Sequence, residues 1–207
     1  KRGSNDVISL QFTIENFLRV FNFSYLKVIG NSFWMALITT VFCILIGYPI
    51  AYAIARLTPR MQGIFMLLVT VPMWINVLVR TYSLISLFSD VGIINNLLRS
   101  IGLQPIHMMW TPFAVVFGMI YNFLPFMILS IYTVISKIDP AIVQASYDLG
   151  ANRRQTFLRI VLPLSLPGII SGITMVFLPA VSSFEIPQLL GGGSFTLVGT
   201  LIESQFV

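Results

Sequence analysis

The chain has 207 residues, of which 57% are apolar and only 9% are charged. An average soluble domain contains roughly 25% charged residues, so this composition provides too few polar side chains to cover a soluble globule. The 12 Lys and Arg residues outnumber the 7 Asp and Glu residues, but they lie between long apolar runs and form no patch of the kind that binds nucleic acid. The composition therefore indicates a membrane protein in contact with lipid and no nucleic-acid partner.

Four uncharged apolar runs are candidates for membrane-spanning helices. Such a helix needs about 20 residues to cross roughly 30 Å of hydrocarbon, and each run approaches or exceeds that length. The first run is the clearest, because it contains no charged residue at all and ends at Arg56. The sequence thus predicts an all-α membrane protein with spans at about 28–55, 63–80, 111–136 and 168–186.

The basic residues in the connections predict how these spans are oriented, because cytoplasmic loops are enriched in Lys and Arg. Arg56 and Arg60 follow the first span, and four more basic residues lie within 137–159, so both connections are expected in the cytoplasm. The connection 80–110 and the tail 187–207 are poorer in basic residues and are expected outside. The aromatic-rich segment 1–27 then also lies outside, along the bilayer surface, and the chain is expected to be a piece of a longer protein.

The second cytoplasmic loop is expected to form two short helices. Asp139 and Pro140 supply an N-cap acceptor and a proline at the first helical position, and Gly150 suits the left-handed residue that ends a helix. Asn152, followed three residues later by Gln155, is typical of a second helix start. A long loop with its own helices is more typical of a docking surface than of a tether, and an amphipathic loop resting on lipid head groups is the alternative.

The same loop resembles the EAA motif found in the permease subunits of bacterial ABC importers. That motif is Glu-Ala-Ala, three residues, Gly, nine residues, Ile, one residue and Leu-Pro, and the chain matches its spacing from Gln144 to Pro163. In that family the first short helix is a coupling helix that docks on the ATPase subunit. The resemblance implies ATPase coupling through the following residues: Gln144, Ala145, Ser146, Asp148, Gly150, Ala151, Ile160, Leu162 and Pro163. Gln144 stands where Glu is usual and Ser146 where Ala is usual, so Asp148 is expected to supply the charge.

Further segments over nearly the whole chain resemble the B-type permease family of spermidine/putrescine importers. They are Asn31-Ser32-Phe33, Gly47-Tyr48-Pro49, 72–80, Leu124-Pro125-Phe126, 148–151 and Leu190-Gly191-Gly192. The resemblance implies the type I ABC importer transmembrane-domain fold, with about four spans present of an expected six. It predicts an external segment 1–27 followed by one transmembrane domain, 28–207, with a coupling loop at 137–167.

The resemblance also implies where the protein works and with what. We expect a multi-pass protein of the bacterial cytoplasmic (inner) membrane that has no cofactor of its own. Its expected partners are two ATP-binding subunits, a second and different permease subunit, an external substrate-binding protein, membrane lipid and a polyamine substrate.

Polar residues within the spans are candidates for the translocation path, because an ionisable group in the membrane is costly unless it faces protein or water. Glu185 is the one acidic residue in or beside a predicted span, and a carboxylate there would attract a cationic substrate. The other candidates are Asn76, Tyr121, Asn122, Ser182 and Ser183, for each of which interhelical hydrogen bonding is the alternative. Arg80 would repel a polyamine, so we expect it to extend outward or to pair with an acid.

Three classes of function can be compared on these residues. An intramembrane enzyme needs paired catalytic groups, whereas the spans contain one Glu, and His107 lies in an outer connection without a partner at metal-ligand spacing. A nucleotide-independent channel would have no use for the coupling motif. The sequence therefore predicts a non-enzymatic permease subunit of an ATP-driven importer, with polyamines as cargo or, alternatively, ferric iron, sulfate, thiamine or an opine.

Overall fold

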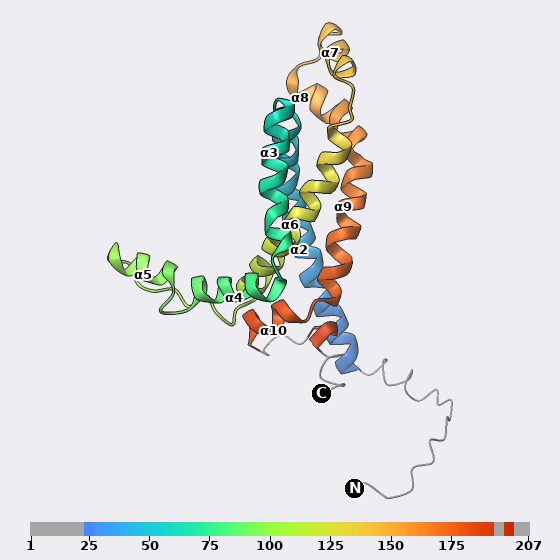
Figure 1. Ribbon diagram of the computed structural model, residues 1–207. Coiled ribbons are helices and arrows are strands. Elements are labelled where there is room, and N and C mark those ends of the chain that lie inside the picture. The colour runs from blue at the N-terminus through green and yellow to red at the C-terminus, as the bar shows by residue number, and fades with distance from the viewer. Residues whose placement is uncertain (1–22, 193–196, 201–207) are drawn as a thin grey trace, which may run out of the picture.

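The computed structural model describes residues 23–192 and 197–200, and the regular elements of this part are helices (Figure 1). The expected external segment therefore lies almost wholly outside the described residues. In chain order the elements are α2 (Phe23–Ala55), α3 (Pro59–Thr70), the 3-10 helix η1 (Val71–Trp74), α4 (Val77–Phe88), α5 (Ile93–Ser100), α6 (Pro112–Ile135), α7 (Pro140–Asp148), α8 (Arg153–Thr156), the π-helical turn η2 (Phe157–Val161), α9 (Leu162–Ser182) and α10 (Glu185–Gly191).

A bundle of long helices forms the body of the molecule. Helices α2, α6 and α9 all pack against one another, and α3 runs beside α2 and α6 (Figure 1). The short helix α7 lies beyond one end of this bundle. Helices α4 and α5 leave the bundle at the opposite end, where α10 also lies (Figure 1).

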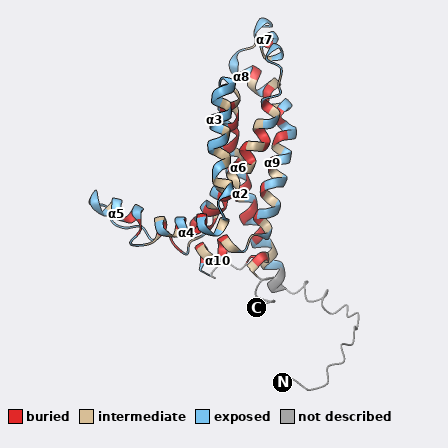
Figure 2. Ribbon diagram, viewed as in Figure 1, coloured by how far each residue is buried: buried red, intermediate tan, exposed pale blue. Residues whose placement is uncertain are grey.

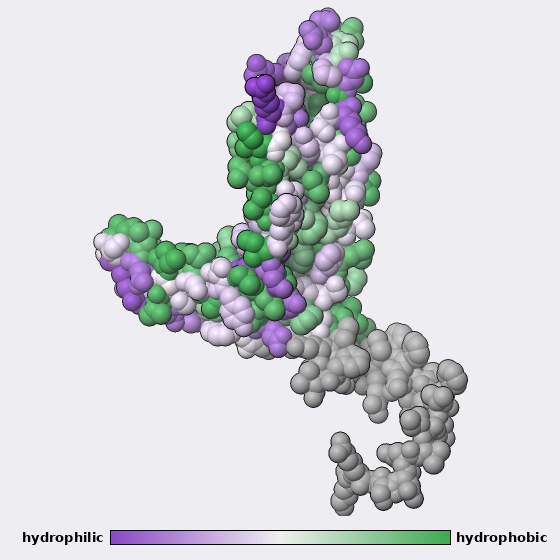
Figure 3. Space-filling model, in the orientation of Figure 1, coloured by the Kyte–Doolittle hydropathy of each residue, from purple (hydrophilic) through white to green (hydrophobic). Residues whose placement is uncertain are grey.

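Four helical stretches are long and apolar enough to cross a membrane, namely Leu26–Ala55, Val77–Ser100, Pro112–Ile135 and Arg153–Ser182. Three of them cover most of a span expected from the sequence, whereas Val77–Ser100 shares only residues 77–80 with the expected span 63–80. Large apolar side chains on the outside of the bundle are well exposed, for example Leu45 at 63% and Ile170 at 62%. In a membrane this surface faces lipid or a partner subunit, and Figure 3 shows hydrophobic residues along the flank of α3 and hydrophilic ones around α7.

The structure corrects the expected second span, 63–80, which is not one continuous helix. Helix α3 ends at Thr70, η1 follows, and α4 begins only at Val77 and runs away from the bundle (Figure 1). Pro72 has no N–H to continue an α-helical ladder. Asn76 starts the new helix, since its Oδ1 accepts a hydrogen bond of 2.8 Å from Leu78 N. From the usual helical rise per residue, α3 and η1 together are about 26 Å long.

The structure also corrects the start of the fourth span, which was expected at 168. The helical stretch begins at Arg153 and continues through Pro163 and Pro167 to Ser182. In the π-helical turn η2, Leu162 N donates to Phe157 O, five residues back. This wider turn directly precedes Pro163, whose ring would clash with the preceding turn of a regular α-helix.

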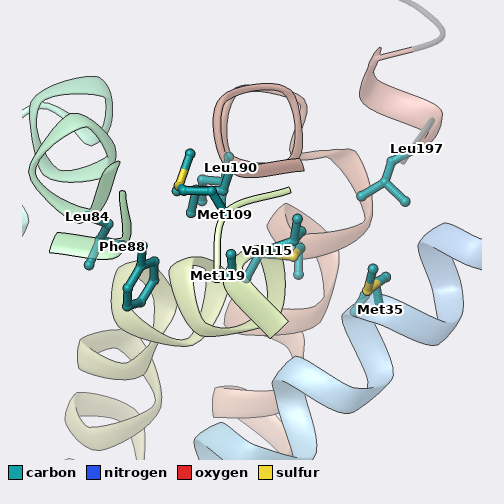
Figure 4. Close-up of a cluster of buried hydrophobic side chains, with 12 residues drawn as sticks. Met35, Leu84, Phe88, Met109, Val115, Met119, Leu190 and Leu197 are labelled. Carbon is teal, nitrogen blue, oxygen red and sulfur yellow. The ribbon is translucent and has the colours of Figure 1, made fainter. Parts of the chain in front are cut away.

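Buried residues lie along the long helices of the bundle (Figure 2). The buried hydrophobic residues form two clusters. The cluster near the α4 end joins α2, α4, α6, α9 and α10, and it includes Met35, Leu84, Phe88, Met119 and Leu190 (Figure 4). The cluster toward α7 includes Cys43, Tyr48, Ile131 and Val176. Burial of apolar surface contributes about 25 cal/mol per Å² to stability. The two clusters therefore hold together the helices that bear the two candidate sites described below.

Candidate functional site

The helix expected to couple to the ATPase is present as α7, with the predicted start and end. Asp139 Oδ1 accepts a hydrogen bond of 2.8 Å from Ala141 N, and Pro140 is the first helical residue. At the other end Gly150 has φ +82°, a left-handed conformation that favours glycine. Ala151 N then donates to Ser146 O over 3.0 Å, which closes the last turn. The local prediction for this helix is confirmed.

The second short helix of the loop is also confirmed, although it forms only the first turn of a longer one. Gln155 N donates to Asn152 Oδ1 and Asn152 N donates to Gln155 Oε1, each over 2.9 Å. This reciprocal pair is the capping box expected from the sequence. Helix α8 leads without interruption into η2 and α9, so α7 is connected to a membrane-spanning helix by a structured corner.

Ser146 lies inside this corner, away from the surface. Its exposed fraction is 5%, its Oγ donates to Val143 O over 2.7 Å, and the hydroxyl of Thr156 lies 2.9 Å away on α8. Because the Ser146 proton is directed to Val143, Thr156 is left to donate to Ser146. The residue that replaces the usual Ala of the motif thus joins α7 to α8.

The remaining motif residues divide between an exposed surface and the bundle. Gln144 and Asp148, one helical turn apart, line a hollow of about 660 Å³ together with Tyr52 of α2 and Arg56, which follows α2. Leu149 is 89% exposed at the tip. A second hollow, of about 460 Å³, is lined by Ala145, Leu149, Gly150, Ala151 and Ile160. Leu162 instead packs against the core cluster, and Pro163 is exposed on the first turn of α9.

A second candidate site lies at the opposite end of the bundle, where α4, α6, α9 and α10 meet. A cavity of about 310 Å³ is lined there by Asn122, Ser182, Ser183 and Glu185 and also by Arg80. Four of the six residues proposed for the translocation path are thus brought together, from the end of α9, the start of α10 and the interior of α6. Asn76, which caps α4, and Tyr121, which is 41% exposed on α6, are not part of this lining.

Two buried side chains in this cavity have polar atoms without a partner among the described residues. Asn122 is 1% exposed, and its Nδ2 donates to Gly118 O over 2.8 Å, but its Oδ1 accepts nothing. Arg80 is 9% exposed, and its Nε and Nη1 donate to nothing in this part of the chain. Buried polar groups are nearly always hydrogen-bonded, because leaving one unsatisfied costs about 1–3 kcal/mol. The cavity is therefore suited to a polar ligand or to water.

The environment of Arg80 differs from both expectations derived from the sequence. The side chain does not extend outward from a span, since it is buried on α4. It also forms no ion pair with Glu185, the acidic residue that lines the same cavity. Sequence reasoning missed Arg80 as a cavity residue because it treated 63–80 as one helix with Arg80 at its end.

Comparison with known proteins assigns the class of the protein. Residues 44–206 match the family described as "Binding-protein-dependent transport system inner membrane component". The chain therefore belongs to this family of ABC transporter permeases, and it is a multi-pass protein of the inner membrane. Assignment to a family of transport subunits agrees with the function class predicted from the motif.

Particular relatives resemble the chain over its whole length. It is 40% identical to "Spermidine/putrescine transport system permease protein PotB" of Haemophilus influenzae, with 100% of this chain and 73% of that protein covered. The protein of the same name from Escherichia coli (strain K12) is 39% identical, with 76% of it covered. Among solved structures, this chain is similar to a chain of a bacterial alginate ABC transporter in complex with an alginate pentasaccharide-bound periplasmic protein. The two chains superpose with a TM-score of 0.75 and are 20% identical, and the match covers 91% of this chain and 69% of the transporter chain. The last match confirms the type I importer fold.

Proposed function

We propose that the chain forms one half of the translocation pathway of an ATP-driven importer for spermidine and putrescine. The observation that supports this cargo most directly is the 40% identity, along the entire chain, to a relative named for it. Glu185 adds physical support, because it places a carboxylate at a cavity between helices where an ammonium group could bind. In this role the chain does no chemistry, and ATP is hydrolysed on a partner subunit.

We propose further that α7 is the coupling helix and that its end of the bundle faces the cytoplasm. Arg56 lies in the turn between α2 and α3 and Arg60 in the first turn of α3, and this turn is at the same end of the bundle as α7 (Figure 1). Both loops rich in basic residues are thus on one side, as the positive-inside rule requires. The exposed Leu149 and the two hollows beside α7 offer apolar and polar contacts to an ATPase subunit.

This arrangement implies partners on both sides of the membrane. The proposed assembly has two ATP-binding subunits below the coupling helices, a second and different permease subunit beside this one, and an external substrate-binding protein at the α4 end. Within this chain the path would pass the cavity residues Asn122, Ser182, Ser183 and Glu185, with Asn76 and Tyr121 at its approaches.

Sulfate is the second candidate cargo, because the cavity also contains the Arg80 guanidinium. This guanidinium is buried and its Nε and Nη1 have no partner within residues 23–192 and 197–200, which suits it to bind an oxyanion. The two candidates differ in which side chain attracts the cargo, so they predict opposite effects of neutralising Glu185 and Arg80.

The test is ATP-dependent uptake of labelled spermidine, putrescine and sulfate into vesicles that contain the complete complex. Glu185→Gln should weaken polyamine uptake, and Gly150→Pro should abolish it, because proline cannot adopt the φ of +82°. Asp90→Asn removes a carboxylate outside the cavity and serves as the matched control. Absence of polyamine uptake while the complex still hydrolyses ATP would refute the cargo assignment, and sulfate uptake would replace it.

A further inference from the structure

We propose that the side arm, residues 77–110, lies along the outer surface of the bilayer, with the exposed apolar face of α5 in contact with lipid. The side arm consists of α4, α5 and the connection that leads to α6. This inference goes beyond the proposed function, but it rests on one part of it, the orientation in which the α7 end of the bundle faces the cytoplasm.

The side arm is held in a defined shape by polar contacts of its own. Asn95 of α5 is fully buried, although it is polar. Its Nδ2 donates to Ser89 O over 3.1 Å and to Ile106 O over 3.0 Å, and its Oδ1 accepts from Ile106 N over 2.8 Å. At the base of the arm, Trp110 N donates to Leu190 O of α10 over 3.1 Å. These contacts fix the direction in which each face of α5 points relative to the bundle.

Helix α5 is amphipathic, and part of its apolar side is turned outward. Ile93, Leu97 and Ile101 share one side of the helix because they follow one another at four-residue spacing, and each is 62–65% exposed. Arg99, which is also exposed, lies about 200° around the helix from Leu97 and therefore on the opposite side. A short helix with one apolar and one polar or basic side is typical of a helix that lies in a membrane interface.

The apolar side of the arm is directed toward the membrane. The side arm leaves the bundle at the end opposite α7 and runs sideways from it (Figure 1). Hydrophobic residues cover the edge of the arm on the α7 side, and hydrophilic residues gather on the opposite edge near the tip (Figure 3). With α7 in the cytoplasm, the hydrophobic edge faces the hydrocarbon of the bilayer and the hydrophilic edge faces external water.

Exposed aromatic side chains mark a membrane interface at the same end of the bundle. Trp74 directly precedes the arm and is 83% exposed, and Tyr82 and Trp110 within the arm are more than half exposed. Trp34, the remaining tryptophan of the chain, is at this end too, since it lines a hollow with Pro112, the first residue of α6. Trp and Tyr are enriched at the boundary between hydrocarbon and water, because each combines an apolar ring with a polar group. A lipid surface therefore explains both the aromatic residues and the two edges of the arm.

The test measures the surroundings of two positions of α5 in the complete complex, reconstituted in vesicles of phosphatidylethanolamine and phosphatidylglycerol. A spin label is attached to Leu97→Cys or, as the matched control on the opposite side, to Arg99→Cys, after the native cysteines of the complex have been replaced. Electron paramagnetic resonance then measures collision of the label with oxygen, which concentrates in lipid, and with a water-soluble nickel chelate. The ratio of oxygen to nickel collision should be several-fold higher at Leu97 than at Arg99, and Ile93→Cys should resemble Leu97→Cys.

Two results would overturn the inference. A ratio at Leu97 as low as that at Arg99 would mean that the apolar side of α5 faces water. Little collision with either reagent at Leu97 would mean that a protein subunit covers this side, so that the arm is a protein interface and not a lipid contact.

The orientation on which the inference rests is tested separately, in intact spheroplasts. A membrane-impermeant maleimide added outside should react with Arg99→Cys, whereas Arg60→Cys, at the exposed start of α3, should react only after the membrane is permeabilised. Reaction of Arg60→Cys in intact spheroplasts would refute the proposed orientation and the inference with it. Protection of Arg60→Cys together with a low ratio at Leu97 would refute the lipid contact alone, and spermidine uptake tests the proposed cargo independently of both.

Discussion

The end of the coupling helix offers a test in which backbone conformation can be separated from packing. Gly150 has φ +82°, and a Cβ added there would have no heavy atom within 4 Å. Substitution therefore creates no clash, and its whole cost is the left-handed backbone, about 1–2 kcal/mol for an ordinary L-residue. A free-energy difference of 1.4 kcal/mol corresponds to a tenfold change in an equilibrium constant. A cost of about 2 kcal/mol therefore lowers the equilibrium population of molecules in which α7 ends as observed by about 30-fold, relative to competing conformations.

The expected result is a rank order of coupling efficiency. Gly150→Asn should be mild because Asn visits this conformation, Gly150→Ala should be worse, and Gly150→Val worst because of its branched side chain. The assay is the ratio of spermidine taken up to ATP hydrolysed by the complex in vesicles. Gly63→Ala in α3 also meets nothing within 4 Å, but it has a helical backbone and should leave the ratio unchanged. Equal losses in the Asn, Ala and Val variants would refute the conformational reasoning.

Two further predictions concern how α7 and the bundle are held together. Ser146→Ala should destabilise the α7–α8 corner by about 1–2 kcal/mol, because buried Thr156 loses its hydrogen-bond partner. The double variant Ser146→Ala, Thr156→Val should lose less stability than the sum of the two single variants. The stability of the corner is measured by limited proteolysis of the complex. Gly168→Ala would place a Cβ 2.9 Å from the Ser130 carbonyl and should lower the unfolding temperature, at a cost of about 1–3 kcal/mol, while Gly30→Ala, with open space, should not. Equal unfolding temperatures for the two glycine variants would contradict the packing argument.

The coupling loop could be predicted in detail because its structure depends on local chemistry. The residues that start and end its helices act locally. Three of them cap backbone groups no more than three residues away, namely Asp139, Asn152 and Gln155. Pro140 and Gly150 act through their own backbone dihedral φ. Such interactions are determined by sequence spacing alone. The expectation and the structure therefore agree there almost residue by residue.

The spans were predicted less accurately because hydropathy does not show where a helix bends. The run 63–80 is predominantly apolar, yet Pro72 and the cap at Asn76 divide it into helices of different direction. Both features were visible in the sequence, and reading them as a helix end and a helix start would have located the break. The reverse holds at Pro163, where the π-helical turn η2 allows a proline inside a continuous helix. That turn has no comparable sequence pattern.

The cavity could be predicted only in part, since its lining comes from three separate regions of the sequence, which are α4, α6 and the junction of α9 with α10. Polarity within an apolar run identified Asn122, Ser182, Ser183 and Glu185 as candidates. That Arg80 joins them depends on the direction of α4 after the break, and so on tertiary packing. The same break made Arg80 seem to lie at the end of a span.

The two sites are linked by the pair of helices that they share. From Asn122 at the cavity, α6 runs about 21 Å to Ser136 beside α7, estimated from the helical rise per residue. Helix α9 returns from the coupling corner to Ser182, and the close approach of Gly168 to the Ser130 carbonyl holds the two helices together. We expect this pair to transmit a displacement of α7 as one stiff unit.

The stiffness should end just before the cavity. Pro125 follows Asn122 by three residues in α6, and Pro179 precedes Ser182 by three residues in α9. Both prolines thus lie on the α7 side of a cavity residue, and each removes one backbone hydrogen bond from its helix. A rigid displacement that begins at α7 would therefore be taken up as bending at these two positions. Such bending would move Asn122 and Ser182, two residues that line the cavity.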